Sequence, residues 1–152
     1  MQTPVFFLAR ALLVALLLGS AGVQAQETPI GLWKSVDDAS GKVRSLVRIT
    51  EVDGALRGVI EKIILQPGED ANAVCKECND ERKDKPILGL TIMRGLKKNA
   101  QGQYDDGEIL DPENGKIYRC RVTLKEGGKK LEMRGYIGTP LLGRTQTWLR
   151  EQ

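Results

Sequence analysis

The sequence predicts an all-β protein: an up-and-down antiparallel β-barrel of about eight strands that follows an N-terminal signal helix. Three observations predict it. Runs of strand length recur along the chain, and each is ended by Gly, Asn or Asp residues. Several of these runs alternate between apolar and polar residues, which is the pattern of a sheet with one buried face. Helical spacing is not sustained anywhere after the first 25 residues.

Residues 1–25 have the pattern of a cleavable signal peptide. Arg10 supplies a positive charge, residues 11–18 are an unbroken apolar run, and residues 23–25 (VQA) place small residues where a signal peptidase reads them. The run is shorter than the roughly 20 apolar residues that a membrane span needs. We therefore expect an exported protein, periplasmic or secreted in a Gram-negative bacterium. Its mature part, 26–152, is expected to be one domain without a membrane span.

The strand-length runs define the expected order of elements. Asp53-Gly54 between two such runs is the strongest short-range hairpin signal, and residues 67–86 form a long polar loop that contains two cysteines. The run at 87–96 is ambiguous between a strand and a short helix. The expected strands are 30–36, 43–52, 55–65, 87–96, 103–110, 116–125, 130–137 and 143–150.

A meander of this length favours closure into a barrel. Sheets twist, and an open edge presents unpaired backbone groups that invite association. Eight strands enclose an interior wide enough for side chains or for one small ligand. A sandwich of two sheets is the alternative architecture.

The alternation also predicts which side chains point inward. In 116–125 and 130–137, one face of each strand is apolar and the other is charged. These inward side chains either fill the core or line a pocket for one small apolar molecule. The candidate ligand-binding residues are Tyr118, Val122, Leu131, Met133 and Ile137.

The composition excludes several function classes. The chain has no histidine, so it lacks the commonest general base near neutral pH and the commonest metal ligand. Its 23 Lys and Arg residues are nearly balanced by 20 Asp and Glu residues, and the signs alternate along the chain. We find no catalytic constellation, so we expect a protein that is not an enzyme and has no cofactor, no metal site and no nucleic-acid partner.

Three cysteines leave the disulfide connectivity open. In an exported protein, Cys75 and Cys78 are expected to form a structural disulfide, or one of them pairs with Cys120. The alternatives are a redox-active dithiol, which needs a lowered thiol pKa, and a soft-metal site built from two or three thiolates. By alternation, Cys120 lies on the apolar face of its strand and is either a buried core residue or a partner for the loop.

A series of motifs runs through the chain in a fixed order. They are GLW at 31–33, CKEC at 75–78, PILGL at 86–90, LDP at 110–112, GKIYRC at 115–120, RGYIG at 134–138, and LGRT at 142–145 with Trp148. Together they resemble the bacterial exported family called domain of unknown function 2147, over about residues 29–150. The resemblance implies a lipocalin-like β-barrel that holds a small apolar ligand, and it implies no established activity.

The Gly-x-Trp opening is similar to the start of lipocalins, in which the tryptophan packs against an arginine from the last strand. The resemblance therefore implies a structural lock between Trp33 and either Arg144 or Arg150. Three functions follow as expectations. The first is a barrel that binds a small hydrophobic ligand. The second is an envelope module that contacts another protein or a second copy in a homodimer. The third is a thiol redox protein that uses Cys75 and Cys78.

Overall fold

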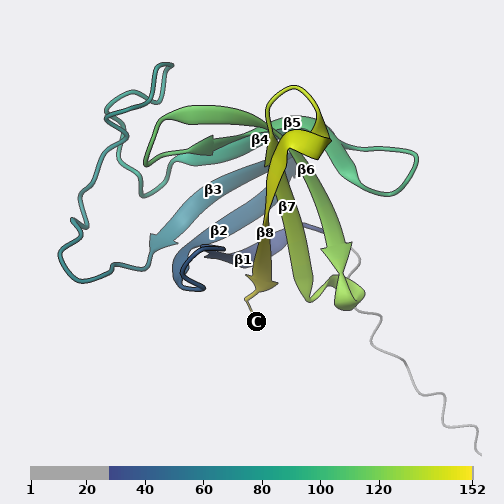
Figure 1. Ribbon diagram of the computed structural model, residues 1–152, viewed down its shortest axis with the longest axis horizontal. Coiled ribbons are helices and arrows are strands. Elements are labelled where there is room, and N and C mark those ends of the chain that lie inside the picture. Colours follow the sequence, from purple (N-terminus) through teal and green to yellow (C-terminus); the bar gives the residue numbers. More distant parts are fainter. Residues whose placement is uncertain (1–27, 152) are drawn as a thin grey trace, which may run out of the picture.

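The computed structural model describes residues 28–151, which form one closed antiparallel β-barrel (Figure 1). Each strand pairs with the next in the sequence, and the last strand pairs with the first. The predicted all-β barrel of eight strands is confirmed. The strands are β1 (Gly31–Val36), β2 (Val43–Val52), β3 (Ala55–Ile63), β4 (Thr91–Lys98), β5 (Tyr104–Asp111), β6 (Lys116–Lys125), β7 (Lys130–Tyr136) and β8 (Gly143–Arg150).

The hairpin turns follow directly from the sequence. Asp53 and Gly54 have φ angles of 51° and 75°, the left-handed conformation that a two-residue turn requires at both central positions. They join Val52 to Ala55, which are paired residues in the β2–β3 ladder. The β6–β7 hairpin is equally regular, since its register runs without a shift to the pair Lys125 and Lys130.

One connection departs from the short-turn pattern. β3 ends at Ile63, two residues before the predicted end, and the ambiguous run at 87–96 joins the sheet only from Thr91. Between them, residues 64–90 form a long loop along the outside of the barrel, at the left of Figure 1. The loop folds back on itself through an isolated bridge between Val74 and Pro86. Pro86 lacks an N–H group and Gly89 has a φ of 83°, so the chain here cannot continue a regular strand.

The barrel has two different ends. At one end, which we call the closed end, the β2–β3 and β6–β7 turns lie close to a densely packed core. The other end, which we call the open end, contains the β5–β6 turn at 112–115 and the starts of β6 and β8. The fully buried side chains that fill the interior include Trp33, Val47, Ile49, Leu56, Met93, Leu96, Val122 and Leu131.

The barrel is closed by a short ladder. Strands β1 and β8 pair only through Trp33 with Arg150 and Lys34 with Leu149. The other ladders between neighbouring strands pair four or more residues each. The pairing of β1 with β8 therefore lies toward the closed end, and the two strands separate toward the open end.

The predicted signal peptide, residues 1–25, lies outside the described residues. Among residues 28–151, no helix is both long and apolar enough to cross a membrane.

Candidate functional site

The open end of the barrel leads into an interior cavity of about 320 Å³. Its walls come from all eight strands and from the β5–β6 turn, so the whole barrel positions the site. The deep part of the cavity is apolar and includes one tryptophan. Its deep lining residues are Ile60, Ile92, Ile109, Leu110, Tyr118, Met133 and Trp148.

A small polar group interrupts the apolar wall near the separation of β1 and β8. The hydroxyl oxygens of Ser35 and Ser45 are 2.7 Å apart, and the backbone N–H of Ser45 donates to the Ser35 hydroxyl at 3.1 Å. On the opposite side of the gap, the indole N–H of Trp148 donates to Oε1 of Gln146 at 3.1 Å. The cavity can therefore offer hydroxyl and amide groups to one polar atom of a ligand without disturbing the apolar floor.

Ion pairs surround the rim of the cavity. The Arg44 guanidinium lies 2.7 Å from a Glu69 oxygen and 3.0 Å from a Glu113 oxygen, so it connects β2, the long loop and the β5–β6 turn. Arg144 forms an ion pair with Asp38 and lies 3.9 Å from Asp37. These contacts tie together segments that are far apart in the sequence.

The rim carries a net negative charge. Its two arginines face five carboxylates, those of Asp37, Asp38, Glu69, Asp111 and Glu113. Hydrogen bonds from the Ser40 side chain and backbone lower the pKa of Asp37. The hydrogen bond from Arg144 lowers the pKa of Asp38. Both groups are therefore ionised at neutral pH, and they disfavour the entry of an anion.

The structure divides the predicted ligand-binding residues into three groups. Tyr118 and Met133 line the cavity. Val122 and Leu131 are fully buried on the same inward face, but they are part of the packed core beyond the cavity. Ile137 is 66 % exposed and does not line the cavity, so its predicted inward position is wrong. Since β7 ends at Tyr136, the alternation of its side chains does not extend to Ile137.

The closed end is sealed by Arg150 and Trp33. The guanidinium carbon of Arg150 is 4.2 Å from the centroid of the Trp33 ring. The same guanidinium donates to the backbone carbonyls of Gly128 at 2.6 Å, Thr28 at 2.6 Å and Ile30 at 3.1 Å. Of the two arginines considered for this contact, Arg150 makes it.

Arg144 instead lies on the rim of the cavity at the opposite end of β8. It is therefore not part of the lock at Trp33.

The cysteine connectivity is local. Cys75 and Cys78 form a disulfide, and both are fully buried. Cys120 is a buried free cysteine, so the alternative pairing of Cys120 with the loop is wrong. The Cys75 sulfur lies 3.6 Å from the carbonyl oxygen of Pro112, which places the disulfide against the β5–β6 turn beside the cavity. Within residues 28–151, no cluster of three or more His, Cys, Asp or Glu residues could hold a metal ion.

Sequence reasoning missed the polar residues of the site. Ser45 shares the inward face of β2 with Val47 and Ile49, and Gln146 shares the inward face of β8 with Trp148. A polar residue on an otherwise apolar face was the available signal. The rim arginines carried no such signal, because their role depends on loops that meet only in the folded chain.

Eight antiparallel strands in sequence order around one interior cavity define a lipocalin-like β-barrel. The chain belongs to the bacterial family DUF2147, described as "Uncharacterized protein conserved in bacteria", whose model matches residues 31–150. The resemblance drawn from the sequence motifs is thereby confirmed.

One solved structure has the same fold. It is titled "Protein HP1028 from the human pathogen Helicobacter pylori belongs to the lipocalin family". It is 22 % identical, with a TM-score of 0.68, and the match covers 81 % of this chain and 82 % of that chain. At this level of identity the likeness concerns the fold. A search of curated protein sequences found no match.

Proposed function

We propose that this protein binds one small, mainly apolar molecule in the barrel cavity and acts as a carrier rather than an enzyme. The observation that carries the proposal is the cavity itself, which is enclosed by the barrel wall, sealed at the Trp33 end and open at the other. A packed barrel would have filled this volume with side chains, as the closed end does. Pockets for small molecules are typically apolar with a few placed polar groups, which describes this cavity.

The size of the cavity limits the ligand. At about 30 Å³ for each water-sized group, a volume of about 320 Å³ holds roughly ten non-hydrogen atoms. Burial of an eight-carbon chain contributes about 6 kcal/mol, from which the cost of association must be subtracted. We therefore expect a simple eight-carbon probe to bind weakly, with a dissociation constant of about 1 mM or above.

The charge of the rim limits the polar end of the ligand. Five carboxylates surround two arginines, and each arginine already has a carboxylate partner. A ligand with a neutral or cationic polar group is therefore favoured over one with a carboxylate. Ser35, Ser45 and Gln146 are the groups placed to hydrogen-bond with the polar end.

The proposed place of action is outside the cytoplasm. This part of the proposal rests on the signal-peptide pattern of residues 1–25. The predicted homodimer and the protein-interaction role stay predictions. No structural observation favours the thiol redox role, because both sulfurs of the Cys75–Cys78 disulfide are buried.

Trp148 supplies a direct assay, because its side chain lines the cavity. Octanol, octylamine and octanoate are titrated into the protein while tryptophan fluorescence is recorded. A Trp148→Phe variant identifies the contribution of Trp33, which lies in the packed core. We expect saturable changes with octanol and octylamine, and weaker binding of octanoate. A protein whose Trp148 responds to none of the three would refute the carrier proposal.

A blocking variant locates the site. A Cβ atom at Gly135 would lie 3.5 Å from Tyr118 and 3.6 Å from Ile109, both of which line the cavity. The larger side chain of Gly135→Leu therefore extends into the ligand volume and should weaken octanol binding at least about tenfold. Thr147→Val is the matched control, since Thr147 is exposed on a neighbouring strand. Equal binding by Gly135→Leu and by the unmodified protein would place the ligand elsewhere.

A further inference from the structure

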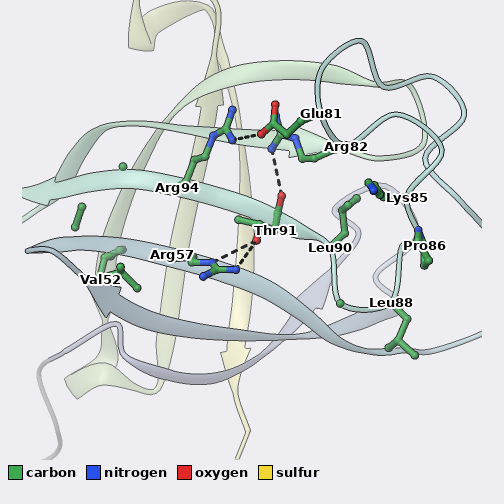
Figure 2. A pocket seen from close by; sticks show the side chains of 14 residues that line it. Val52, Arg57, Glu81, Arg82, Lys85, Pro86, Leu88, Leu90, Thr91 and Arg94 are labelled. Carbon is green, nitrogen blue, oxygen red and sulfur yellow. Dashed lines mark hydrogen bonds and ion pairs between the residues drawn. The ribbon is translucent and has the colours of Figure 1, made fainter.

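A second hollow of about 590 Å³ lies on the outer wall of the barrel, and the interior cavity does not include it. Strands β3 and β4 form its floor, and the second half of the long loop forms one side (Figure 2). We call it the outer groove. Its lining includes Val52, Arg57, Arg82, Lys85, Leu88 and Arg94.

Two arginines face each other across the floor of the outer groove. Arg57 on β3 is the register partner of Arg94 on β4. Like charges in directly opposite positions of a strand pair are unfavourable. Arg94 is compensated, because its guanidinium lies 2.7 Å from Glu108 and 2.5 Å from Glu81.

Arg57 has no such compensation within residues 28–151. Among these residues its guanidinium donates only to the Thr91 hydroxyl, at 3.2 and 3.3 Å, as the dashed lines in Figure 2 show. Among the residues that the structure describes, no carboxylate forms an ion pair with Arg57 or with the exposed Lys85, which also lines the groove. The groove thus presents two cationic groups that a ligand's anion can neutralise.

The loop side of the outer groove is held in place. Arg82 is 4 % exposed, and its guanidinium donates to both carboxylate oxygens of Asp80 and to the backbone carbonyl of Thr91 at 3.2 Å. The Cys75–Cys78 disulfide and the bridge between Val74 and Pro86 stabilise the same loop. A groove with fixed walls binds with a smaller entropic cost than a mobile loop surface.

Two apolar side chains are exposed along the outer groove. Leu88 is 54 % exposed and Val52 is 45 % exposed, and both line the hollow. In Figure 2 they lie at opposite ends of the groove with Arg57 between them, Leu88 on the loop and Val52 at the end of β2. Apolar surface beside unneutralised cations is complementary to a molecule that has an anionic head and an apolar chain.

We propose that the outer groove is a second binding site, for an anionic amphiphile. Its carboxylate or phosphate head contacts Arg57 and Lys85, and its apolar part covers Leu88. The two hollows then differ in their charge preference: the interior cavity has a negative rim, and the outer groove presents free cations. The site does not depend on the interior cavity being occupied.

The test uses octyl phosphate as the soluble probe, followed by backbone amide chemical shifts in the mature protein. We expect saturable shifts confined to residues 52–57 and 81–95, and no such shifts with octyltrimethylammonium. The double variant Arg57→Gln, Lys85→Gln should weaken binding at least about tenfold, because charge-assisted hydrogen bonds to the head are lost. Lys129→Gln is the control, since this exposed lysine lies at the β6–β7 turn and carries the same charge.

A second arm distinguishes a free amphiphile from a lipid in a membrane. Sedimentation with phosphatidylglycerol vesicles is compared for the unmodified protein and the double variant. Binding of octyl phosphate supports a free ligand, and vesicle binding that depends on Arg57 and Lys85 supports a lipid headgroup. The proposal is overturned if neither probe binds, or if the double variant binds both as well as the Lys129→Gln control does.

Discussion

Replacement of Arg150 by alanine tests the closed end of the barrel. The change removes three hydrogen bonds to the carbonyls of Gly128, Thr28 and Ile30, together with the contact of 4.2 Å to the Trp33 ring. Hydrogen bonds from charged groups contribute about 1.5–3 kcal/mol when buried, and we take about 1 kcal/mol for each because this guanidinium is partly exposed. The cation–π contact adds about 0.5–1 kcal/mol.

The expected loss for Arg150→Ala is therefore about 3.5–4 kcal/mol of unfolding free energy. For a domain of this size, 1 kcal/mol corresponds to about 4 °C, so the melting temperature should fall by roughly 14–16 °C. Urea unfolding followed by circular dichroism measures the free energy, and a thermal scan measures the melting temperature.

Two control variants separate the lock from a general effect of charge. Arg150→Lys keeps the positive charge over Trp33 but cannot reach three carbonyls at once, so it should lose about half as much free energy. Arg144→Ala removes an ion pair whose arginine side chain is 63 % exposed, and it should cost less than about 1 kcal/mol. If Arg150→Ala destabilised the protein no more than Arg144→Ala does, the assignment of the lock to Arg150 would be refuted.

Three further predictions concern single residues. Burial raises the pKa of the Cys120 thiol, so a thiol reagent at pH 8 should label Cys120 only at the rate of unfolding; rapid labelling of the folded protein would contradict its burial. The hydrogen bond from Arg82 lowers the pKa of Asp80 from 3.8 to about 2, so its stabilisation is present above pH 4 and is lost as the pH falls toward 2. When the pH falls from 4 to 2, the unfolding free energy of the unmodified protein should decrease by up to about 2 kcal/mol more than that of the Asp80→Asn variant. The prediction would be disproved if the unfolding free energies of the two proteins changed in parallel with pH. Arg57→Thr removes a like charge opposite Arg94 and should stabilise the protein by a few tenths of a kcal/mol in urea unfolding, and a clear loss of stability would contradict the electrostatic argument.

Local patterns were sufficient to predict most of the fold. Asp53-Gly54 and the alternation in β6 and β7 depend on neighbours in the sequence, and the strand pairing follows from short connections. The prediction failed at Ile137 because a strand's end is set by the turn that follows. Here Gly138 has a φ of 73°, and the chain leaves the ladder after Tyr136.

The candidate site was less predictable because it depends on long-range register. Arg144 and Arg150 lie on the same face of β8, so alternation cannot choose between them as the partner of Trp33. The choice is made by the pairing of Trp33 with Arg150, which joins the first and last strands. The rim is similar, since Arg44 meets Glu69 and Glu113 only when the loop and the β5–β6 turn fold to the same end.

The short ladder between β1 and β8 has a consequence for how the chain reaches its native state. Seven ladders join strands that are neighbours in the sequence, whereas this one joins residues near the two extremes of the domain and makes only two residue pairs. The entropy lost in bringing distant segments together grows with their separation, and few contacts compensate for it here. The hairpins should therefore form first, and the pairing of β1 with β8 that closes the barrel should form last. In native-state hydrogen exchange, the backbone amides of the β1–β8 ladder should therefore exchange faster than those of the β6–β7 ladder.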